Sequence, residues 1–394
     1  MACIYAEIRV CANSYMAIRE MLQLGDICEK VTDYVASGSF AALKENVLIT
    51  NEENYALMVK TADFANGFTK GLTYTDKHGY EFLHNSNLFG GELILSNIGS
   101  IGKVFKVPYL NRPMTLASNS VMLKTSDNTL RDYLYYFFLS PTGYKNLLSI
   151  SSGTSMKKFN KTELKKLEVP IPEHDIQLHI VSTLDKLQSI ITHRKQQLAK
   201  LDELVKARFV EMFGDPITNP LNWKKDKTEH HIDLLSGFPF KSEQYVDSGV
   251  NICGGLIIMP QRIEWDSCVH WATTKGYEEY LLAKDDIVMA LDRPWITEGF
   301  KIALVDGEHL PALLIQRTAR IRATDINQKY LYHCFINGGF DKHTNITGSL
   351  VPHISAKDIK SFEILLPPLD LQNQFAAFVQ QTDKSKFVRK DQNR

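Results

Sequence analysis

The side chains best suited to chemistry in this 394-residue chain lie in two similar glycine loops. The loop at 152–158 reads Ser-Gly-Thr-Ser-Met-Lys-Lys, and the loop at 347–353 reads Thr-Gly-Ser-Leu-Val-Pro-His. Hydroxyls, backbone amides and cations are the groups that contact nucleic-acid phosphates. Gly99 and Gly102, followed by Lys103, form a Gly-x-x-Gly segment that either clamps a nucleic-acid backbone or closes an ordinary hairpin.

Arginines are concentrated in the second half of the chain, where they could read base edges. Arginine is the commonest reader of guanine, because its planar fork matches two acceptors in the major groove. Arg320 and Arg322 alternate along an expected strand and therefore share one face, which either lines a groove or is solvated. The residues predicted to contact nucleic acid are Lys70, Asn97, Ser100, Lys103, Arg112, Thr154, Lys157, Lys158, Lys241, Arg293, Lys301, Arg317, Arg320, Ser349 and His353.

Catalytic chemistry is poorly supported by the residue patterns. Glu163 with Lys165, and Asp358 with Lys360, resemble fragments of a nuclease site, but neighbours two apart on a helix do not face each other. The Asn-Pro-Leu-Asn segment at Asn219 lacks the second proline and the aromatic residue of an amino-methyltransferase motif. The six cysteines contain no Cys-x-x-Cys pair, so neither a zinc site nor a disulfide framework is indicated. We therefore predict no catalytic residue, no metal and no cofactor in this chain.

The elements that must position these residues are duplicated. Residues 152–177 align without a gap with residues 347–372. The identical pairs are Gly153/Gly348, Lys165/Lys360, Glu168/Glu363, Pro172/Pro367, Asp175/Asp370 and Gln177/Gln372. Apolar runs upstream predict strands at 92–96, 103–107 and 120–124, with helices at 131–139 and 142–148. In the second copy 286–291 occupies the position of 92–96, whereas segments 30–90 and 241–280 show no resemblance to each other.

A long helix is predicted between the copies, from about Pro172 to Gly214. Positions at alternating intervals of four and three are apolar there, except for two that hold Arg194 and Arg208. This is a heptad seam, which requires a partner helix. The seam and docking residues are Ile180, Leu184, Leu187, Ile191, Leu198, Leu201, Val205 and Met212, with Phe375 and Val379 on the matching C-terminal helix. About 40 residues span ~60 Å at the rise of an α-helix, against ~34–36 Å for one turn of duplex DNA. The C-terminal helix loses the apolar pattern at Thr382 and Lys386, so it is expected to be about half as long.

Bulk properties restrict the class of protein. The formal net charge is zero, which argues against a nonspecific DNA coat but leaves a specific binder open. The apolar fraction of 44% suffices for two cores of ordinary size. No apolar run approaches membrane-spanning length, and residues 1–20 look like a loosely attached leader rather than a secretory signal. We expect a cytoplasmic protein with no membrane partner.

Three features together resemble the specificity (S) subunits of type I restriction-modification enzymes. They are the duplicated segment from Gly153 and Gly348, the spacer end Arg-Phe-Val-Glu-Met-Phe-Gly-Asp-Pro at 208–216 with Asn-Pro-Leu-Asn-Trp at 219–223, and the domain openings at 24–28 and 235–242. The resemblance covers about residues 20–385. It implies a non-catalytic, DNA-binding subunit that reads a bipartite site and docks methyltransferase (M) and motor-nuclease (R) subunits. S-adenosylmethionine and ATP/Mg would then act only in those partners.

The resulting expectation is a mixed α/β (α+β) fold with two similar target-recognition domains joined by a long coiled-coil helix, the second helix being truncated. The expected division is a leader at 1–20, domain 1 at 21–172, the spacer helix at 173–214, domain 2 at 215–367 and the shortened C-terminal helix at 368–394. The truncation would leave Leu198, Leu201, Val205 and Met212 of the spacer seam without an intramolecular partner. This part of the helix would then fray, or it would be covered by an M subunit or by a second copy of the chain. The alternatives are a stand-alone restriction or methylation enzyme, and a coiled-coil adaptor without a DNA function.

Overall fold

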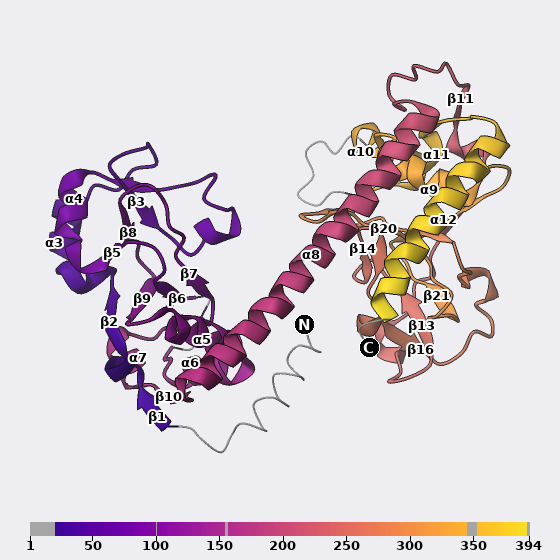
Figure 1. Ribbon diagram of the computed structural model, residues 1–394. Helices are drawn as coiled ribbons and strands as arrows, with labels where there is room; N and C mark the ends of the chain where they lie inside the picture. The colour runs from indigo at the N-terminus through magenta and orange to yellow at the C-terminus, as the bar shows by residue number, and fades with distance from the viewer. Residues whose placement is uncertain (1–19, 100, 154–156, 345–352, 392–394) are drawn as a thin grey trace. The chain divides into compact units, whose positions relative to one another are not determined.

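The computed structural model describes residues 20–99, 101–153, 157–344 and 353–391. The chain divides into two compact units, residues 1–192 and 193–394, and a single helix, α8 (His174–Phe213), runs from the first into the second (Figure 1). All of the predicted leader except Glu20 lies outside the described residues. Within the described part of the chain, no helix has both the length and the apolar character needed to cross a membrane.

The first unit is built on two four-stranded sheets. One has the order β2–β9–β6–β7 and is antiparallel throughout, with strands Cys28–Asp33, Ser120–Thr125, Leu93–Ser96 and Val104–Lys106. The other has the order β4–β3–β8–β5, with strands Tyr74–Thr75, Ala56–Val59, Met114–Leu116 and Asn87–Leu88. In this second sheet the central pair β3–β8 is parallel. A separate pair joins β1 (Glu20–Gln23) to β10 (Glu168–Ile171).

The second unit repeats this arrangement, with one strand fewer in its second sheet. Its main sheet has the order β12–β22–β17–β20, with strands Ile232–Ser236, Thr318–Ala323, Ile287–Ala290 and Ile302–Leu304. Its second sheet has the order β16–β13–β21, with strands Val269–Trp271, Val250–Cys253 and Ala312–Leu314, and again the pair β13–β21 is parallel. The separate pair joins β11 (Lys225–Lys227) to β23 (Glu363–Leu365). Two short hairpins are added: β14 (Ile258–Met259) with β15 (Arg262–Ile263), and β18 (Trp295–Ile296) with β19 (Gly299–Phe300).

The structural duplication therefore extends through the segments that share no sequence pattern. Strands β3 and β4 lie within 30–90, and β13 and β16 lie within 241–280, yet the two pairs occupy the same places in their sheets. The isolated bridge Leu281↔Leu313 stands where β5 pairs with β8. The absence of sequence resemblance between these segments therefore does not mean that their folds differ. A sheet constrains side chains mainly by an inward and outward alternation, so different sequences satisfy the same ladder.

Equivalent side chains close both copies with the same hydrogen bonds. The Tyr133 hydroxyl donates to the carbonyl of Pro170 at 2.6 Å, and the Tyr330 hydroxyl donates to that of Leu365 at 2.9 Å. The side-chain amides of Gln177 and Gln372 each donate at 2.8 Å to the carbonyl of the proline five residues earlier. These bonds tie the helix after the central sheet to the edge that leads into each long helix.

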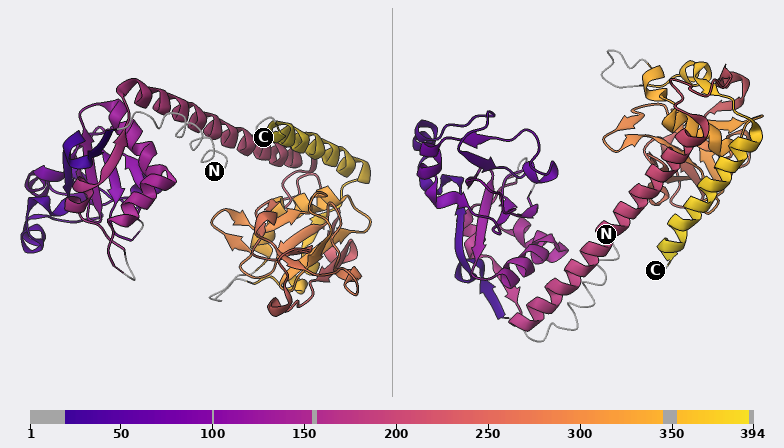
Figure 2. Two further views of the ribbon diagram at one scale, coloured as in Figure 1. Left: turned by 90° about the horizontal axis from the view of Figure 1, so that it is seen from below. Right: turned by 45° about the horizontal axis from the view of Figure 1, so that its top comes forward.

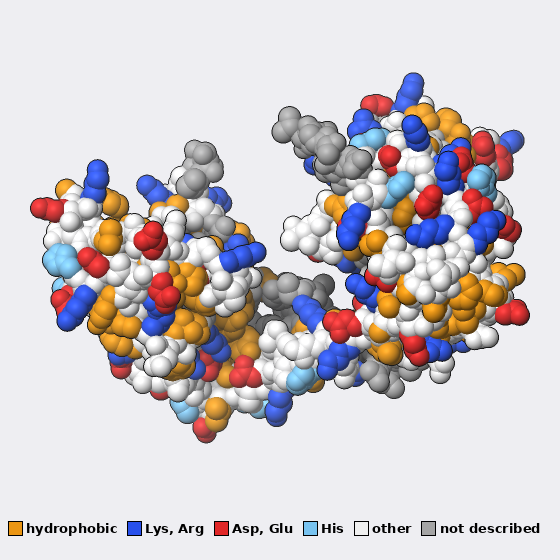
Figure 3. Space-filling model, turned by 90° about the horizontal axis from the view of Figure 1, so that it is seen from above, with side chains coloured by type: hydrophobic (Ala, Val, Ile, Leu, Met, Phe, Trp, Pro, Cys, Tyr) orange, Lys and Arg blue, Asp and Glu red, His pale blue; other side chains and the backbone are white. Residues whose placement is uncertain are grey.

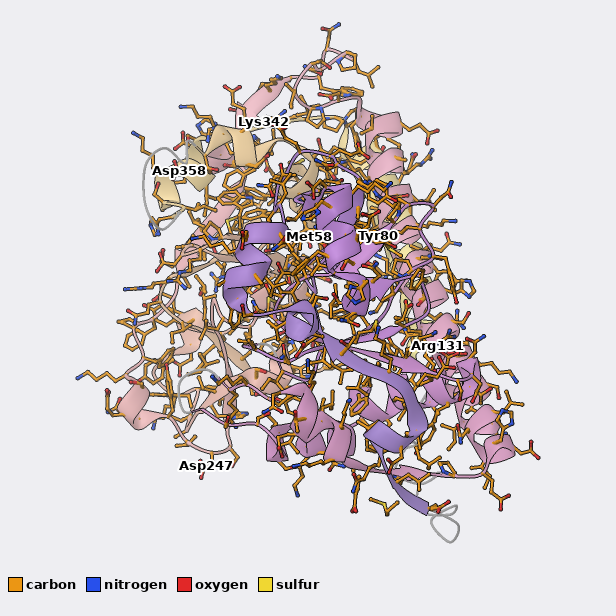
Figure 4. All side chains as sticks on the ribbon, turned by 90° about the vertical axis from the view of Figure 1, so that its left-hand side faces the viewer. Met58, Tyr80, Arg131, Asp247, Lys342 and Asp358 are labelled. Carbon is orange, nitrogen blue, oxygen red and sulfur yellow. The ribbon has the colours of Figure 1, made fainter. Side chains whose placement is uncertain are left out.

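The helices begin where capping residues accept orphaned amide groups. In the first unit α5 (Asn128–Leu139) is capped by Asp127, and in the second α9 (Gln328–Asn337) is capped by Asn327. The helix α11 (Ala356–Ser361) begins with a capping box between Ser355 and Asp358, and Asp358 is labelled in Figure 4. The remaining helices are α2 (Leu24–Ile27), α3 (Phe40–Asn46), α4 (Lys77–Phe82), α6 (Pro141–Ser149), α7 (Lys161–Lys166), α10 (Phe340–His343) and α12 (Leu369–Asp391).

The two ends of α8 belong to the cores of different units. Val181 is buried in the core of the first unit, and Ile180 packs against that core. In the second unit Phe209 and Phe213 are buried with Tyr330 and Phe375, and the rings of Phe213 and Tyr330 lie 4.8 Å apart. Gly214, with φ of +78°, then ends the helix.

The C-terminal helix α12 lies antiparallel to the second half of α8, as Figures 1 and 2 show. Phe375 packs on Phe209, with ring centroids 5.4 Å apart, while further along α12 Lys386 pairs with Asp202 at 2.7 Å. With 23 residues against 40, α12 is the shorter helix, as the sequence predicted. The structure corrects one detail. Val205 and Met212 were predicted to belong to the free part of the seam, but Val205 is buried in the core of the second unit and Met212 packs against that core.

Candidate nucleic-acid interface

In the first unit, loops that are far apart in the sequence meet at one edge of the main sheet. Strand β6 ends at Ser96, and the backbone N–H of the next residue, Asn97, donates to the carbonyl of Asn119 at 3.2 Å. The carbonyl of Asn97 in turn accepts from the N–H of Phe159 at 3.1 Å. The connections β6–β7 and β8–β9 and the segment leading into α7 therefore share this edge, called here the loop edge.

Exposed cations lie on the loop edge of the first unit. Lys103, Lys157 and Lys158 are all exposed, and Lys158 is held by backbone bridges to Ile98 and Ser152. Asn97, in contrast, is half-buried, and its side-chain amide donates to the carbonyl of Phe159 at 3.1 Å. It therefore positions the loop, whereas the lysines are free to reach a ligand.

The second unit has a loop edge of the same construction. The N–H of Leu291 donates to the carbonyl of Arg317 at 2.9 Å, and the carbonyl of Leu291 accepts from the N–H of Ile354 at 2.8 Å. A backbone bridge joins Asp292 to His353, as Ile98 is joined to Lys158 in the first unit. The hydrogen-bond pattern thus makes Arg317 equivalent to Asn119, and His353 equivalent to Lys158.

A carboxylate organises the side chains at this second loop edge. Asp292 pairs with the guanidinium of Arg317 at 3.0 Å and with Nδ1 of His353 at 2.6 Å. The Arg317 and His353 side chains are 75% and 56% exposed, so both are within reach of a ligand. Arg293, next to Asp292, is exposed and has a left-handed φ of +45°.

Two residues of the predicted set are buried and bound within the protein. Lys301 is 7% exposed, and its ammonium group donates to the carbonyl of Gly255. Desolvation lowers the pKa of Lys301 from its usual value. Arg320 is 6% exposed and pairs with Asp233 at 2.9 Å. The face that Arg320 shares with Arg322 is not freely solvated, because Arg322 also pairs within the protein, with Asp286 at 2.6 Å.

The other predicted contacts fall in different places. Arg112 lies at the opposite end of the first unit's sheets, where it pairs with Glu53 at 3.0 Å and stacks on the Tyr74 ring. Lys70 is exposed in the segment that follows β3. The carbonyl of Val59, the last residue of β3, accepts from the N–H of Ala117 beside the loop edge. Lys241 is exposed in the connection from β12 to β13. Three of the predicted residues lie outside the described part of the chain: Ser100, Thr154 and Ser349.

The sequence reasoning missed two residues that the structure places at the loop edges, Asn119 and Asp292. Aligning the strand at 286–291 with that at 92–96 sets Asp292 opposite Ile98, so the repeat contained the signal. Asn119 offered only a general signal, because asparagine is favoured where φ is positive but the sequence does not show the φ of +67° that the structure gives.

The spacer residues divide into three groups. Ile180 packs in the first unit, and Val205 and Met212 in the second, where they join Phe375 and Val379 of α12. The others belong to neither hydrophobic core of the described residues and are called here the open seam: Leu184, Leu187, Ile191, Leu198 and Leu201. Leu198 is 44% exposed, and neighbouring Ile190 is 52% exposed.

The surfaces of both units carry charges of both signs. Figure 3 shows lysine and arginine side chains interspersed with acidic ones on the displayed faces of both units. Among the described residues no group of three histidine, cysteine or acidic side chains is placed to hold a metal ion. The ion pairs hold side chains in place. On α5, for example, the guanidinium of Arg131, labelled in Figure 4, pairs with the carboxylate of its neighbour Asp132 at 2.8 Å.

Comparison with known proteins agrees with this architecture. Over 383 residues the chain is 24% identical to the type I restriction enzyme MjaVIII specificity subunit of Methanocaldococcus jannaschii, covering 92% of this chain and 86% of the relative. It is 28% identical over 214 residues to the type I restriction enzyme EcoAI specificity subunit of Escherichia coli, covering 50% of this chain and 36% of that protein. The fold resembles the crystal structure of the type I restriction-modification system S subunit from M. genitalium, with a TM-score of 0.52 at 14% identity over 95% of this chain and 92% of that one. The model of the type I restriction modification DNA specificity domain matches residues 19–203 and 242–393, and the chain therefore belongs to the family of type I restriction-modification specificity subunits.

Proposed function

We propose that this chain reads a bipartite DNA site, with each unit contacting one half-site through its loop edge. The observation that carries the proposal is the repetition of one three-loop construction with different side chains at equivalent positions. The first unit has Asn119 and Lys158 where the second has Arg317 and His353. A shared frame with different readers suits two half-sites of different sequence.

Affinity and specificity would come from different residues. Lys157 and Lys158 would contact phosphates, because they are exposed and a lysine ammonium lacks the planar fork that matches a base edge. Phosphate contacts fix the register of the protein on DNA but carry no sequence information. Arg293 and Arg317 would face base edges, because a guanidinium can bond two acceptors of one guanine. Zero net charge is compatible with this division, since a few well-placed cations suffice for a specific binder.

The two long helices would serve as spacer and docking surface for the M subunits, with R subunits joining that complex. The open seam, Leu184 to Leu201, is the part of α8 best suited to a partner helix, because a heptad seam needs one. A second copy of this chain is an alternative occupant. Light scattering on the isolated chain tests it: concentration-dependent dimers that Leu198→Glu abolishes support self-association, and a monomer at high concentration excludes it.

Specificity subunits are the non-catalytic members of their enzymes, so methylation and cleavage would be carried out by the partners. S-adenosylmethionine, ATP and Mg would bind there, in the cytoplasm where cellular DNA is methylated. Titration of the isolated chain with S-adenosylmethionine separates this proposal from a stand-alone methylation enzyme, for which tight binding is expected. Salt-dependent, sequence-selective duplex binding by the chain with its M partner separates it from an adaptor without a DNA function.

The decisive experiment is a long-read methylation map of DNA from cells that express this chain with its M subunit. A split asymmetric motif is the expected result, and it means that both units read DNA. A split palindrome would mean that one unit acts in two copies, so the chain dimerises. No motif, with the M subunit intact and expressed, would overturn the proposal.

A further inference from the structure

The loop edge of the second unit contains an ion-pair cluster that stability does not explain. Asp292, Arg317 and His353 come from three separate segments, yet the guanidinium and the imidazole both converge on one carboxylate. Exposed ion pairs of this kind contribute little to folding, because water screens the charges and two long side chains must be ordered. The convergence therefore calls for an explanation in binding.

The backbone at Arg317 gives a second, independent observation. Its φ is +63°, in the left-handed region that disfavours every residue with a Cβ except asparagine and aspartate. The equivalent residue of the first unit, Asn119, adopts the same conformation with φ of +67°, and for asparagine this conformation costs little free energy. An arginine that stands where asparagine fits better points to a function of its side chain, because strained backbone positions gather at functional sites.

Resting on the proposed function, we propose that Arg317 reads a guanine in the half-site of the second unit and that Asp292 is its positioning residue. The carboxylate holds the guanidinium fork in one orientation before DNA arrives, which reduces the ordering that binding requires. A carboxylate 3.0 Å from the guanidinium also repels a phosphate, so the pair favours an uncharged base edge over the backbone. The remaining donors of the Arg317 fork then match O6 and N7 of guanine.

The first unit lacks this arrangement and provides an internal comparison. The position of Asp292 is taken there by Ile98, an apolar residue beside Lys158. A carboxylate–guanidinium pair at the loop edge is therefore a property of the second unit alone, among the residues that form these equivalent bonds. It follows that altering it should affect one half-site and leave the other unchanged.

The test is the methylation map repeated with four variants, expressed in cells with the M subunit; one of them, Asp292→Glu, is a conservative rescue. Arg317→Lys keeps the charge but loses the fork, and Asp292→Asn keeps the shape but loses the charge. The matched control is Glu229→Gln, which removes the carboxylate of an exposed pair with Lys227 at 3.7 Å. Glu229 precedes β12, whose first residue, Ile232, pairs with the far end of β22 from Arg317.

We expect Arg317→Lys and Asp292→Asn each to relax one guanine in one half-site, raising methylation of sites with another base there on the order of tenfold to a hundredfold. The second half-site should stay as in the unaltered chain, as should the whole motif with Glu229→Gln. Asp292→Glu should restore part of the discrimination. A uniform loss at all sites, from a variant whose unfolding midpoint is unchanged, would mean a phosphate contact and would overturn base reading.

Two further outcomes also decide the matter. An unchanged motif in Arg317→Lys removes Arg317 as a reader. Relaxation in Arg317→Lys but not in Asp292→Asn removes the positioning role of Asp292. Absence of a motif in the unaltered chain is a separate result, because it overturns the proposed function itself.

Discussion

At the scale of single residues, the molecule separates side chains that hold the fold from those left free to bind. Arg320 and Arg317 illustrate this, because they stand three positions apart in one segment. Arg320 is buried against Asp233, whereas Arg317 is exposed on a strained backbone beside Asp292. Two arginines in one segment thus have different roles, and their burial in the structure tells these roles apart.

Replacing Arg317 with asparagine should cost binding specificity without costing stability. The left-handed conformation penalises arginine by about 1 kcal/mol, and the exposed pair with Asp292 contributes about 0–1 kcal/mol. These opposing effects should leave the free energy of unfolding within ~0.5 kcal/mol of its original value, measured by urea denaturation. A decrease above ~2 kcal/mol would show that Arg317 is needed for folding.

His333 should make the second unit sensitive to acid. Its ring is buried near Phe209 and Phe375, and burial lowers its pKa to about 3, with repulsion from Lys386 and Lys329 adding to the effect. The unfolded histidine takes up a proton below about pH 6.5, while the folded one stays neutral until about pH 3. The unfolded state therefore binds more protons in this window, and stability falls as the pH is lowered from 6.5 toward 3.

The variant His333→Phe should lose this part of the acid sensitivity. The measurement compares unfolding midpoints of the two proteins from pH 7 to pH 4, where other groups contribute equally to both. A smaller slope in the variant is expected, and parallel slopes would contradict the effect of burial on His333.

At the scale of elements, the two long helices are supported unequally along their lengths. The C-terminal part of α8 packs against α12 and the core of the second unit, through Phe209, Phe213 and Phe375. Among the described residues the open seam belongs to neither core: Leu198 is exposed, and the other four side chains are half-buried. The contribution of each seam residue to stability therefore depends on its place along the helix rather than on its apolar character.

Truncating Phe375 should destabilise the second unit strongly. Its side chain is fully buried against Phe209 and Phe213, so Phe375→Ala should cost about 3–5 kcal/mol through lost burial and the cavity left behind. The control is Ile190→Ala on α8, where the side chain is 52% exposed and the cost should stay within ~0.5 kcal/mol. Urea unfolding monitored by circular dichroism checks both, and similar losses would contradict the uneven support of α8.

At the scale of the whole molecule, two units with one fold present loop edges of different chemistry on a chain of zero net charge. Binding should then depend on a small number of cations. Removing one phosphate contact should reduce the slope of log affinity against log salt concentration by about one. It should weaken binding to all sequences alike.

The double variant Lys157→Ala, Lys158→Ala tests this expectation in the complete complex with the M subunit. Plotting the logarithm of affinity against that of salt concentration should give a slope smaller by about two, with the recognised motif unchanged. The control Lys227→Ala removes an exposed lysine away from the loop edges and should leave the slope as it was. A changed motif would mean that these lysines read bases.

The sequence by itself determined the duplication, the mixed α/β class and the long helix, because each depends on short-range patterns. Heptad spacing fixes one helix face, and the paired glycines, prolines and glutamines of 152–177 and 347–372 repeat one local structure. It also identified several residues of the loop edges, including Lys158, Arg317 and His353.

Tertiary structure decided what those patterns leave open. It showed that 30–90 and 241–280 form the same strands, because a ladder tolerates many side chains. It buried Lys301 and Arg320, and it brought Asp292 to Arg317 across segments that are distant in the chain. Local spacing assigns a residue to a face of its own element, but whether that face is covered or meets another loop depends on long-range packing.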